Sequence, residues 1–484
     1  MHLGNRDSKA ARAIAQSAFL LTLISALSAA HAGGLSVPDL GAGSLSQGAA
    51  TIASPDDPMA LYYNPGALAW TSGLRLLVDG RAINHQITFQ RLQADGSNPD
   101  NLAQVQNTGP YKVSPALVAA YGFDLRGMPV AIALGGYPAS GYTGYRFPDP
   151  DDLKASLGTC ATCNAENARQ TPQRYAMISL DTLEYTVALG FSAQVTDWLS
   201  VGAAFQDPIV AIRSRQAIAA NPFAPGEFLG YDALLDIRAT DAFTPAGSFG
   251  VSAHLGDLRV GGSFQLPANI KAHGKLSIEV PQVLAAVGAT VQGNQTDVEI
   301  RLPFIARLGV RWVRPSFEVE LAATWDGWNR YKQVIVEPQG VSFQVQGTTV
   351  NLPDIHIPKG LQDSQSVRLG GLYRLGSLVP ALDFLTLRAG VLGETSAVPE
   401  QYTSIDQAHW ERIALTAGLS ARIDRFELTA GYSHFIQPDR QVRDSVVTQP
   451  APLRPPADAT IVGNGDYSAS IDLIGVSISA RFGE

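Results

Sequence analysis

Long runs of alternating apolar and polar residues constrain this chain more than any other feature. Between Asp297 and Trp312 every even-numbered residue is apolar, whereas the odd-numbered positions carry Glu299, Arg301, Arg307 and Arg311. Alternate side chains of a β-strand point to opposite faces, so this pattern predicts a strand with one apolar and one charged face. Strands in soluble sandwiches run to about five or six residues. Several runs here extend to ten or more, the length that a tilted strand needs to cross a bilayer.

The spacing of these runs predicts the architecture. Every second connection between them is short, as at 126–128 and 424–425, and the others are long, as at 148–173. Short turns at one end and long loops at the other are typical of an outer-membrane barrel, whose closure pairs every backbone group in lipid. We therefore predict an all-β fold, a 14-stranded antiparallel transmembrane β-barrel over residues 73–484. The expected strands are 73–91, 114–125, 129–147, 174–195, 199–216, 231–255, 258–280, 296–313, 316–337, 363–375, 383–394, 410–423, 426–436 and 467–482.

Composition excludes several other classes of protein. Charged residues make up 16% of the chain, below the about 25% of soluble proteins, yet after the N-terminus no apolar run reaches the about 20 residues of a spanning helix. Two Cys exclude a disulfide scaffold, and a hydrophobic content of 45% excludes a disordered chain. A net charge of −8 without a Lys/Arg block argues against nucleic-acid binding. A soluble all-β protein is the alternative that composition leaves open.

The first 32 residues predict export. Basic residues at Arg6, Lys9 and Arg12 precede an apolar stretch from Ala18 to Leu27, and an A-x-A site ends at Ala32. This order is typical of a cleaved signal peptide. We expect cleavage after Ala32 and a mature protein in the bacterial outer membrane.

Between that site and the first strand lie residues 33–72, which are rich in Gly, Ala and Ser and show no long alternation. A fourteen-stranded barrel encloses more room than side chains alone fill, so we expect this segment to pack inside it. Two of its stretches, 41–50 (GAGSLSQGAA) and 56–68 (DDPMALYYNPGAL), resemble the N-terminal hatch of the outer-membrane long-chain fatty-acid transporter family (FadL-type). Further similar stretches are 266–275, 325–328, 367–374 and 430–433.

The resemblance implies a monomeric barrel plugged by its hatch. In the family, external loops capture hydrophobic ligands, an internal pocket binds them, and they leave sideways at a kink in the third strand. The family's Asn-Pro-Ala hatch motif matches Asn64 and Pro65 but has Gly66 in third place, and Leu35 holds the position of a pocket-filling apolar residue. Pro lacks a ladder donor and Gly tolerates bulges, so we expect the kink at Gly135, Gly136, Pro138 and Gly141. An ordinary strand irregularity is the alternative.

Several arginines lie at the polar alternate positions of the expected strands, and they are candidates for binding the carboxylate of a ligand. Arginine binds carboxylates in a forked geometry, but ion pairing with the hatch or with lumen acids is the favoured interpretation for most of these side chains. They are Arg301, Arg307, Arg311, Arg368, Arg374 and Arg388.

Enzymatic chemistry is not indicated. The eight His residues are scattered without metal-ligand spacing, no nucleophile or phosphate-loop motif occurs, and we expect neither a metal nor a cofactor. Cys160 and Cys163 lie in an expected external loop, where a local disulfide is more plausible than a redox site.

The favoured hypothesis is passive uptake of hydrophobic small molecules, either long-chain fatty acids or hydrocarbons. Its expected partners are that ligand, the lipid and lipopolysaccharide of the outer membrane, and the outer-membrane assembly machinery. The last strand supports the assembly machinery as a partner. Its alternation ends near an aromatic residue, Phe482, and so resembles the C-terminal signal that this machinery reads. The alternatives are a water-filled porin for polar solutes and a structural or adhesive barrel.

Overall fold

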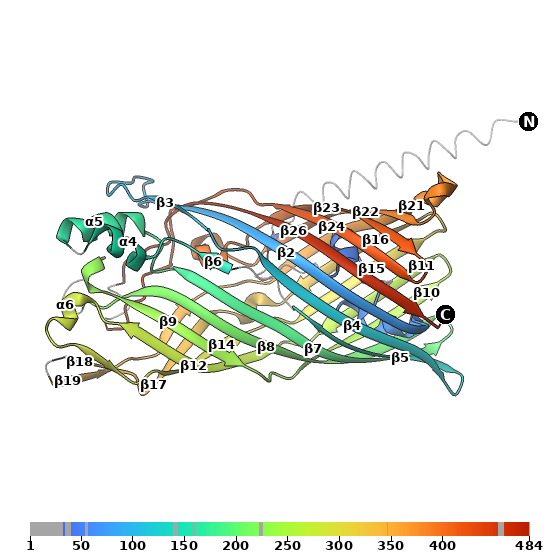
Figure 1. Cartoon of the computed structure of the whole chain (residues 1–484), viewed down its shortest axis with the longest axis horizontal. Helices are drawn as coiled ribbons and strands as arrows, with labels where there is room; N and C mark the ends of the chain where they lie inside the picture. The colour runs from blue at the N-terminus through green and yellow to red at the C-terminus, as the bar shows by residue number, and fades with distance from the viewer. Residues whose placement is uncertain are drawn as a thin grey trace, which may run out of the picture.

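A computed structural model describes residues 32–33, 40–53, 57–138, 144–158, 160–221, 226–345, 347–453 and 459–483. Fourteen antiparallel strands form a closed barrel, in which the first and last strands pair from Leu74–Phe482 to Arg91–Gly465 (Figure 1). Some of these strands are divided into two segments, so each of the fourteen positions around the barrel is called a wall. The expected fold is confirmed. In chain order the walls are β2 (Gly73–Arg91), β4 (Lys112–Leu125), β5 (Met128–Tyr137) with β6 (Gly144–Arg146), β7 (Ser179–Thr196), β8 (Leu199–Ala219), β9 (Asp232–Asp241) with β10 (Ala246–Leu255), β11 (Leu258–Gln265) with β12 (Asn269–Glu279), β14 (Gln295–Arg301) with β15 (Ile305–Val313), β16 (Phe317–Asp326) with β17 (Gln333–Gln339), β20 (Ile355–Pro358) with β21 (Ser364–Arg374), β22 (Leu385–Ser396), β23 (Arg412–Ile423), β24 (Phe426–Ile436) and β26 (Gly465–Phe482).

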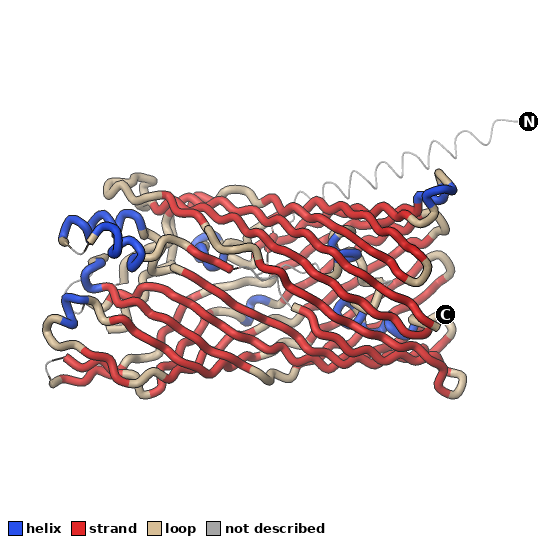
Figure 2. The backbone as a smooth tube through the Cα atoms, in the orientation of Figure 1, coloured by secondary structure: helices blue, strands red, loops and turns tan. Residues whose placement is uncertain are grey.

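Helical turns are confined to the loops and the lumen, and strands make up the wall (Figure 2). No described helix is long and apolar enough to cross a membrane. The smaller elements are β1 (Ala32–Gly33), α2 (Ala42–Leu45), α3 (Ala60–Tyr63), η1 (Pro65–Trp70), β3 (Gln104–Gln106), α4 (Pro150–Leu157), α5 (Ala161–Gln170), η2 (Leu229–Tyr231), α6 (Gln282–Ala285), β13 (Thr290–Gln292), η3 (Trp328–Arg330), β18 (Ser342–Val345), β19 (Thr348–Asn351), η4 (Leu375–Ser377), η5 (Pro380–Leu382), η6 (Glu400–Tyr402), η7 (Ile405–Gln407) and β25 (Arg440–Val442).

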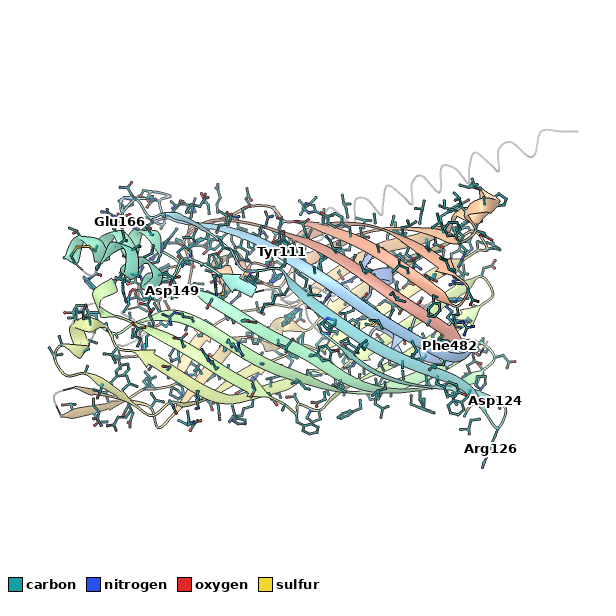
Figure 3. All side chains as sticks on the ribbon, in the orientation of Figure 1. Tyr111, Asp124, Arg126, Asp149, Glu166 and Phe482 are labelled. Carbon is teal, nitrogen blue, oxygen red and sulfur yellow. A yellow bond between two sulfur atoms is a disulfide. The ribbon has the colours of Figure 1, made fainter. Side chains whose placement is uncertain are left out.

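The two ends of the barrel differ as the loop lengths predict. Asp124, Arg126 and Phe482 lie at the end with the short turns, whereas Asp149 and Glu166 lie at the end with the long loops (Figure 3). Because short turns face the periplasm in outer-membrane barrels, the long-loop end is the external end.

Around the short-turn half, the outward side chains form an apolar belt. Leu189, Leu308 and Ile478 are each more than half exposed, although they are apolar. The neighbouring residues of the opposite parity, such as Ser192 and Arg311, are buried toward the lumen. An apolar outer face with a polar interior is the arrangement that lipid requires of a barrel.

Toward the external end this arrangement reverses in three neighbouring walls. Arg307 and Arg311 of β15 point inward, but in β14 the inward residue is Val298 and Arg301 points outward, half exposed. The same change of phase separates β9 from β10 and β11 from β12. A proline lies in each of the three breaks: Pro245, Pro267 and Pro303.

Proline lacks the N–H that a strand ladder uses, so pairing stops there. Beyond the break the alternation restarts with the opposite set of residues, odd or even, pointing inward. The expectation that 231–255, 258–280 and 296–313 are each one uninterrupted strand is therefore wrong. The expectation that Arg301 shares the inward face of Arg307 is wrong for the same reason.

Residues 40–53 and 58–69 are all buried, and they lie inside the short-turn half of the barrel. The barrel carries glycines, which have no side chain, where it touches this segment. A Cβ added to any of ten glycines on ten different walls would come within 3.3 Å of this segment. These glycines are Gly190, Gly202, Gly250, Gly261, Gly309, Gly370, Gly390, Gly418, Gly431 and Gly475.

Several members of this glycine belt are direct cross-strand partners: Gly202 with Gly250, Gly261 with Gly309, Gly370 with Gly390, and Gly431 with both Gly418 and Gly475. The backbone of the inner segment therefore packs directly on the backbone of the wall, with almost no side-chain layer between them.

Candidate functional site

A pocket of about 250 Å³ occupies the lumen on the external side of the buried segment. Its wall consists mainly of inward-facing aliphatic side chains from the external halves of neighbouring strands. They include Val210 and Ile212 of β8, Ile237 of β9, Ile270 of β12, Val298 and Ile300 of β14, and Val334 and Val336 of β17. The pocket exists because of the phase changes, since these prolines turn the apolar faces of β9, β12 and β14 from the outside to the inside.

One side of the pocket is polar. Lys359 forms an ion pair with Asp406 there, and both side chains are largely buried. A guanidinium nitrogen of Arg412 lies 3.2 Å from Nδ1 of His409, and Nε2 of His409 lies 3.4 Å from the hydroxyl of Tyr145. Because a guanidinium only donates, the proton of His409 sits on Nε2. A ligand in the pocket would thus meet aliphatic side chains on most sides and hydrogen-bonding groups at one end.

A second cavity, of about 370 Å³, lies on the outer face between the two described segments of the third wall, β5 and β6. Pairing between β5 and β7 ends at Tyr137–Thr186, and pairing between β6 and β7 begins only at Gly144–Asp181. Figure 1 shows β6 as a separate short strand. The stretch of β7 between these pairs borders both cavities: Thr182 and Glu184 line the lumen pocket, and Leu183 and Tyr185 line the outer cavity.

Comparison with known proteins decides the family. Residues 153–482 match the sequence profile of the family described as "Outer membrane protein transport protein (OMPP1/FadL/TodX)". This match covers more than half of the chain. The chain belongs to this family. The expectations of a FadL-type transport protein, and of a protein that is not an enzyme, are confirmed.

Solved structures agree on the fold of this family member. The chain is similar to a Pseudomonas aeruginosa FadL homologue, with a TM-score of 0.70, 14% identity, and coverage of 93% of this chain and 100% of that one. For the Pseudomonas putida toluene transporter TodX the TM-score is 0.61 at 16% identity, with coverage of 92% and 99%. For the Ralstonia pickettii toluene transporter TbuX it is 0.59 at 14% identity, with coverage of 92% and 99%. No curated protein sequence matches this family member.

The stretch of residues 64–66, which resembles the family's hatch motif, has a specific geometry here. Asn64 is fully buried, and its amide donates to the carbonyl oxygens of Ile52 and Val251, while its side-chain oxygen accepts from the N–H of Gly66. A Cβ on Gly66 would lie 2.6 Å from the backbone of Gly250. The glycine that replaces the family's alanine therefore permits close packing on the wall.

None of the six predicted arginines lines the lumen pocket; its cation is Lys359. Arg311 is paired with Glu318 and Glu320, and Glu320 also accepts from the N–H groups of Ile52 and Ala53 in the hatch. Breaking a buried pair of this kind typically costs about 3–5 kcal/mol. The remaining partners are Tyr62 under the guanidinium of Arg307, Ser366 for Arg368, Glu318 for Arg374, Glu427 for Arg388 and Glu299 for Arg301.

The predicted third-strand residues lie at the interruption. Gly135 and Gly136 are still paired with both neighbouring strands, and the ring of Tyr185 lies over Gly136. Pro138 follows the last residue of β5 and lines the outer cavity. Gly141 lies outside the described residues, as do Leu35 and residues 1–31 of the expected signal peptide.

The external loops carry two further features. Cys160 and Cys163 form a disulfide at the start of α5. Glu227 accepts from both Arg91 and Arg174, and Arg174 also pairs with Asp232, so that three loops meet in one buried network. Among the described residues, no group of three His, Cys, Asp or Glu side chains is arranged to hold a metal ion.

No pattern in the sequence indicated Lys359, Asp406, His409 or Tyr145 as pocket residues. They come from different loops and from β6, and only the closed barrel brings them together at the pocket.

Proposed function

We propose that this protein mediates passive uptake of hydrophobic small molecules across the outer membrane, after export and cleavage behind Ala32. The observation that carries this proposal is the aliphatic lumen pocket on the external side of a tightly packed hatch. Transferring apolar surface from water into such a pocket is favourable. The hatch, packed backbone to backbone on the wall, opposes the alternative of a water-filled porin.

The size of the pocket favours small hydrocarbons as ligands. A cavity of about 150 Å³ lined by apolar side chains is known to bind benzene. The pocket here, at about 250 Å³, has room for a substituted single ring, whereas a long acyl chain would have to extend out of it. Two of the similar structures are toluene transporters by description, which supports the same choice.

We infer that ligands leave the pocket sideways, between β5 and β7. None of the described residues of the third wall pairs with residues 182–185 of β7, which border the lumen pocket on one face and the outer cavity on the other. A ligand that passes here would enter the membrane without crossing water or displacing the hatch.

The pocket is tested by filling it. Ile270→Trp projects a large side chain into the lumen pocket, and Asn269→Trp places the same side chain on the exposed outer face of the same strand. Uptake of radiolabelled toluene, and separately of a long-chain fatty acid, is measured in cells that lack their own transporter. We expect Ile270→Trp to abolish uptake while Asn269→Trp retains it. Equal uptake by both correctly assembled variants would overturn the pocket assignment.

The lateral path is tested in the same cells with Leu183→Trp, which fills the outer cavity, against Leu189→Trp on the lipid-facing belt of the same strand. Reduced toluene uptake by Leu183→Trp alone supports lateral release. Unchanged uptake by both variants would contradict it. If the wild type takes up neither compound but adheres to surfaces through its loops, the adhesive alternative replaces transport.

A further inference from the structure

Three cations occupy directly paired positions on the outer face of the barrel. Arg213 of β8 pairs with Arg238 of β9, and Arg238 pairs with Lys275 of β12. All three side chains are exposed. None of them makes an ion pair or a side-chain hydrogen bond with any residue that the structure describes. Like charges directly opposite one another on a sheet are destabilising, so an anion bound from outside the chain would relieve the repulsion within this row.

The surrounding cations are neutralised in the ordinary way. On the same outer face Arg215 pairs with Asp149 and Asp236, Lys271 lies 3.5 Å from Asp297, and Arg301 pairs with Glu299. Carboxylates are therefore available on this surface. The uncompensated row is a local feature and does not reflect a general shortage of acidic residues.

The position of Arg213, at one end of the row, relative to the apolar belt identifies the surroundings of that end. The pair Asp181–Arg213 lies one step beyond the outward-facing pair Leu183–Ala211. Leu183 begins the apolar series that continues through Val187 and Leu189 along β7, all of them strongly exposed. The apolar belt faces lipid tails, so Arg213 lies at the level where the external headgroups begin.

The row also borders a cavity with an excess of positive charge. This cavity, of about 310 Å³, is lined by five cationic side chains, among them Arg213, Arg238 and Arg146, against two carboxylates, Asp181 and Asp236. Arginine presents planar donor forks that match phosphate oxygens, and charge-assisted bonds of this kind are about twice as strong as neutral ones.

We propose that Arg213, Arg238 and Lys275 form a binding site for the phosphates of the outer-leaflet glycolipid, the lipid A part of lipopolysaccharide. Its acyl chains lie along the apolar belt next to Leu183, and its phosphates neutralise the cationic row. A multiply charged phosphate suits this place better than a single carboxylate, because three adjacent cations must be compensated. The inference concerns the outer face and does not depend on what the lumen pocket binds.

The test compares two double variants of the full-length protein. Arg213→Ala with Arg238→Ala removes two cations of the row, and Lys271→Ala with Arg301→Ala removes two paired cations from the same outer face. Bound lipid A is measured by native mass spectrometry after addition of bisphosphorylated lipid A, and folding is checked by heat-modifiable gel mobility. We expect at least a tenfold loss of affinity in the first variant and little change in the second.

Three outcomes would overturn the proposal. One is equal affinity for lipid A in the two folded variants. Another is equal binding of dephosphorylated lipid A by the wild type. The third is displacement of lipid A by oleate alone, which would assign the row to the carboxylate of a transported ligand. Toluene uptake by the same variants reports on the lumen pathway separately, so a failure of either proposal is distinguishable from a failure of the other.

Discussion

At the scale of single residues, the packing of the hatch depends on glycines in the barrel, which lack a Cβ. A Cβ on Gly250 would lie 2.1 Å from the side-chain oxygen of Asn64, and a Cβ on Gly202 would lie 2.4 Å from the carbonyl oxygen of Pro65. Glycine inside a strand costs about 0.5–1 kcal/mol relative to alanine. Glycine is nevertheless required at these positions, because any side chain would separate the barrel wall from the hatch. The high glycine content of the chain thus has a local reason at these positions.

Gly250→Ala is therefore expected to destabilise the folded barrel by about 1–3 kcal/mol, the usual cost of overpacking. Gly80→Ala is the matched control, because no atom lies within 4 Å of a Cβ at that position. Gly80→Ala should not destabilise the barrel, and removing the entropy cost of a strand glycine should stabilise it by up to about 0.5–1 kcal/mol. The midpoint of guanidinium unfolding, followed by gel mobility, measures both. Equal midpoints for the two variants would show that the hatch yields to the added methyl group.

At the scale of elements, three prolines divide neighbouring walls into segments of opposite phase. Before Pro303 the inward residue is Ile300 and the outward one is Arg301, whereas after it Arg307 points inward and Leu308 outward. The same strand can thus present apolar side chains to the outside in one half and to the lumen pocket in the other.

Cysteine labelling tests this phase change. Arg301→Cys is expected to react with a membrane-impermeant maleimide on intact cells, and Ile300→Cys is expected to be protected. The native cysteines form a disulfide, so they contribute no background. Uninterrupted alternation through Pro303 would give the opposite result, a reactive position 300 and a protected position 301.

The network that joins the external loops has a defined pH dependence. Burial opposes ionisation of Glu227, but the hydrogen bond and charge of Arg91 and the charge of Arg174 outweigh it and lower the pKa of Glu227 below 4.5. An acid with a lowered pKa stabilises the fold fully above its unfolded pKa of about 4.3, and that contribution is lost as the pH falls through the lower, folded pKa.

Glu227→Gln should therefore loosen the loops at pH 7, with a loss of about 1–3 kcal/mol typical of a charge-assisted bond. The difference from the wild type should persist down to about pH 4.5 and disappear in stronger acid. The pKa of Asp232 in the same network is raised, chiefly by burial, so its protonation acts in the opposite direction. Limited proteolysis of the loops across this range isolates the contribution of Glu227, and an equal difference at all pH values would contradict the assignment.

At the scale of the whole molecule, the barrel joins a half filled by the buried N-terminal segment to a half that contains the pocket. Every residue of 40–53 and 58–69 is buried in the first half, and the aliphatic pocket occupies the second. We expect proteoliposomes with the wild type to exclude sugars, and those with residues 33–72 deleted to swell rapidly in them. Brisk sugar flux through the wild type would restore the porin alternative.

Much of the fold was predictable from sequence because β-strands have a strict two-residue period. The number of walls follows from the alternating runs, and the loop lengths orient the barrel. The arginines of β15 were predictable as lumen residues, because the alternation around Arg307 and Arg311 is unbroken. The orientation of Arg301 was not, since one residue of offset at Pro303 inverts every side chain beyond it.

The pocket could not be predicted because its residues share neither a strand nor a spacing. Lys359 and Asp406 are 47 residues apart, and Arg91 meets Glu227 across 136 residues. The sequence by itself determined the barrel class, the family and which side chains face outward within each uninterrupted strand segment, because these depend on local periodicity and on contiguous motifs. Only the tertiary structure decided where the cavities lie, how the hatch is held and which outer cations are left uncompensated, because these depend on register between distant strands.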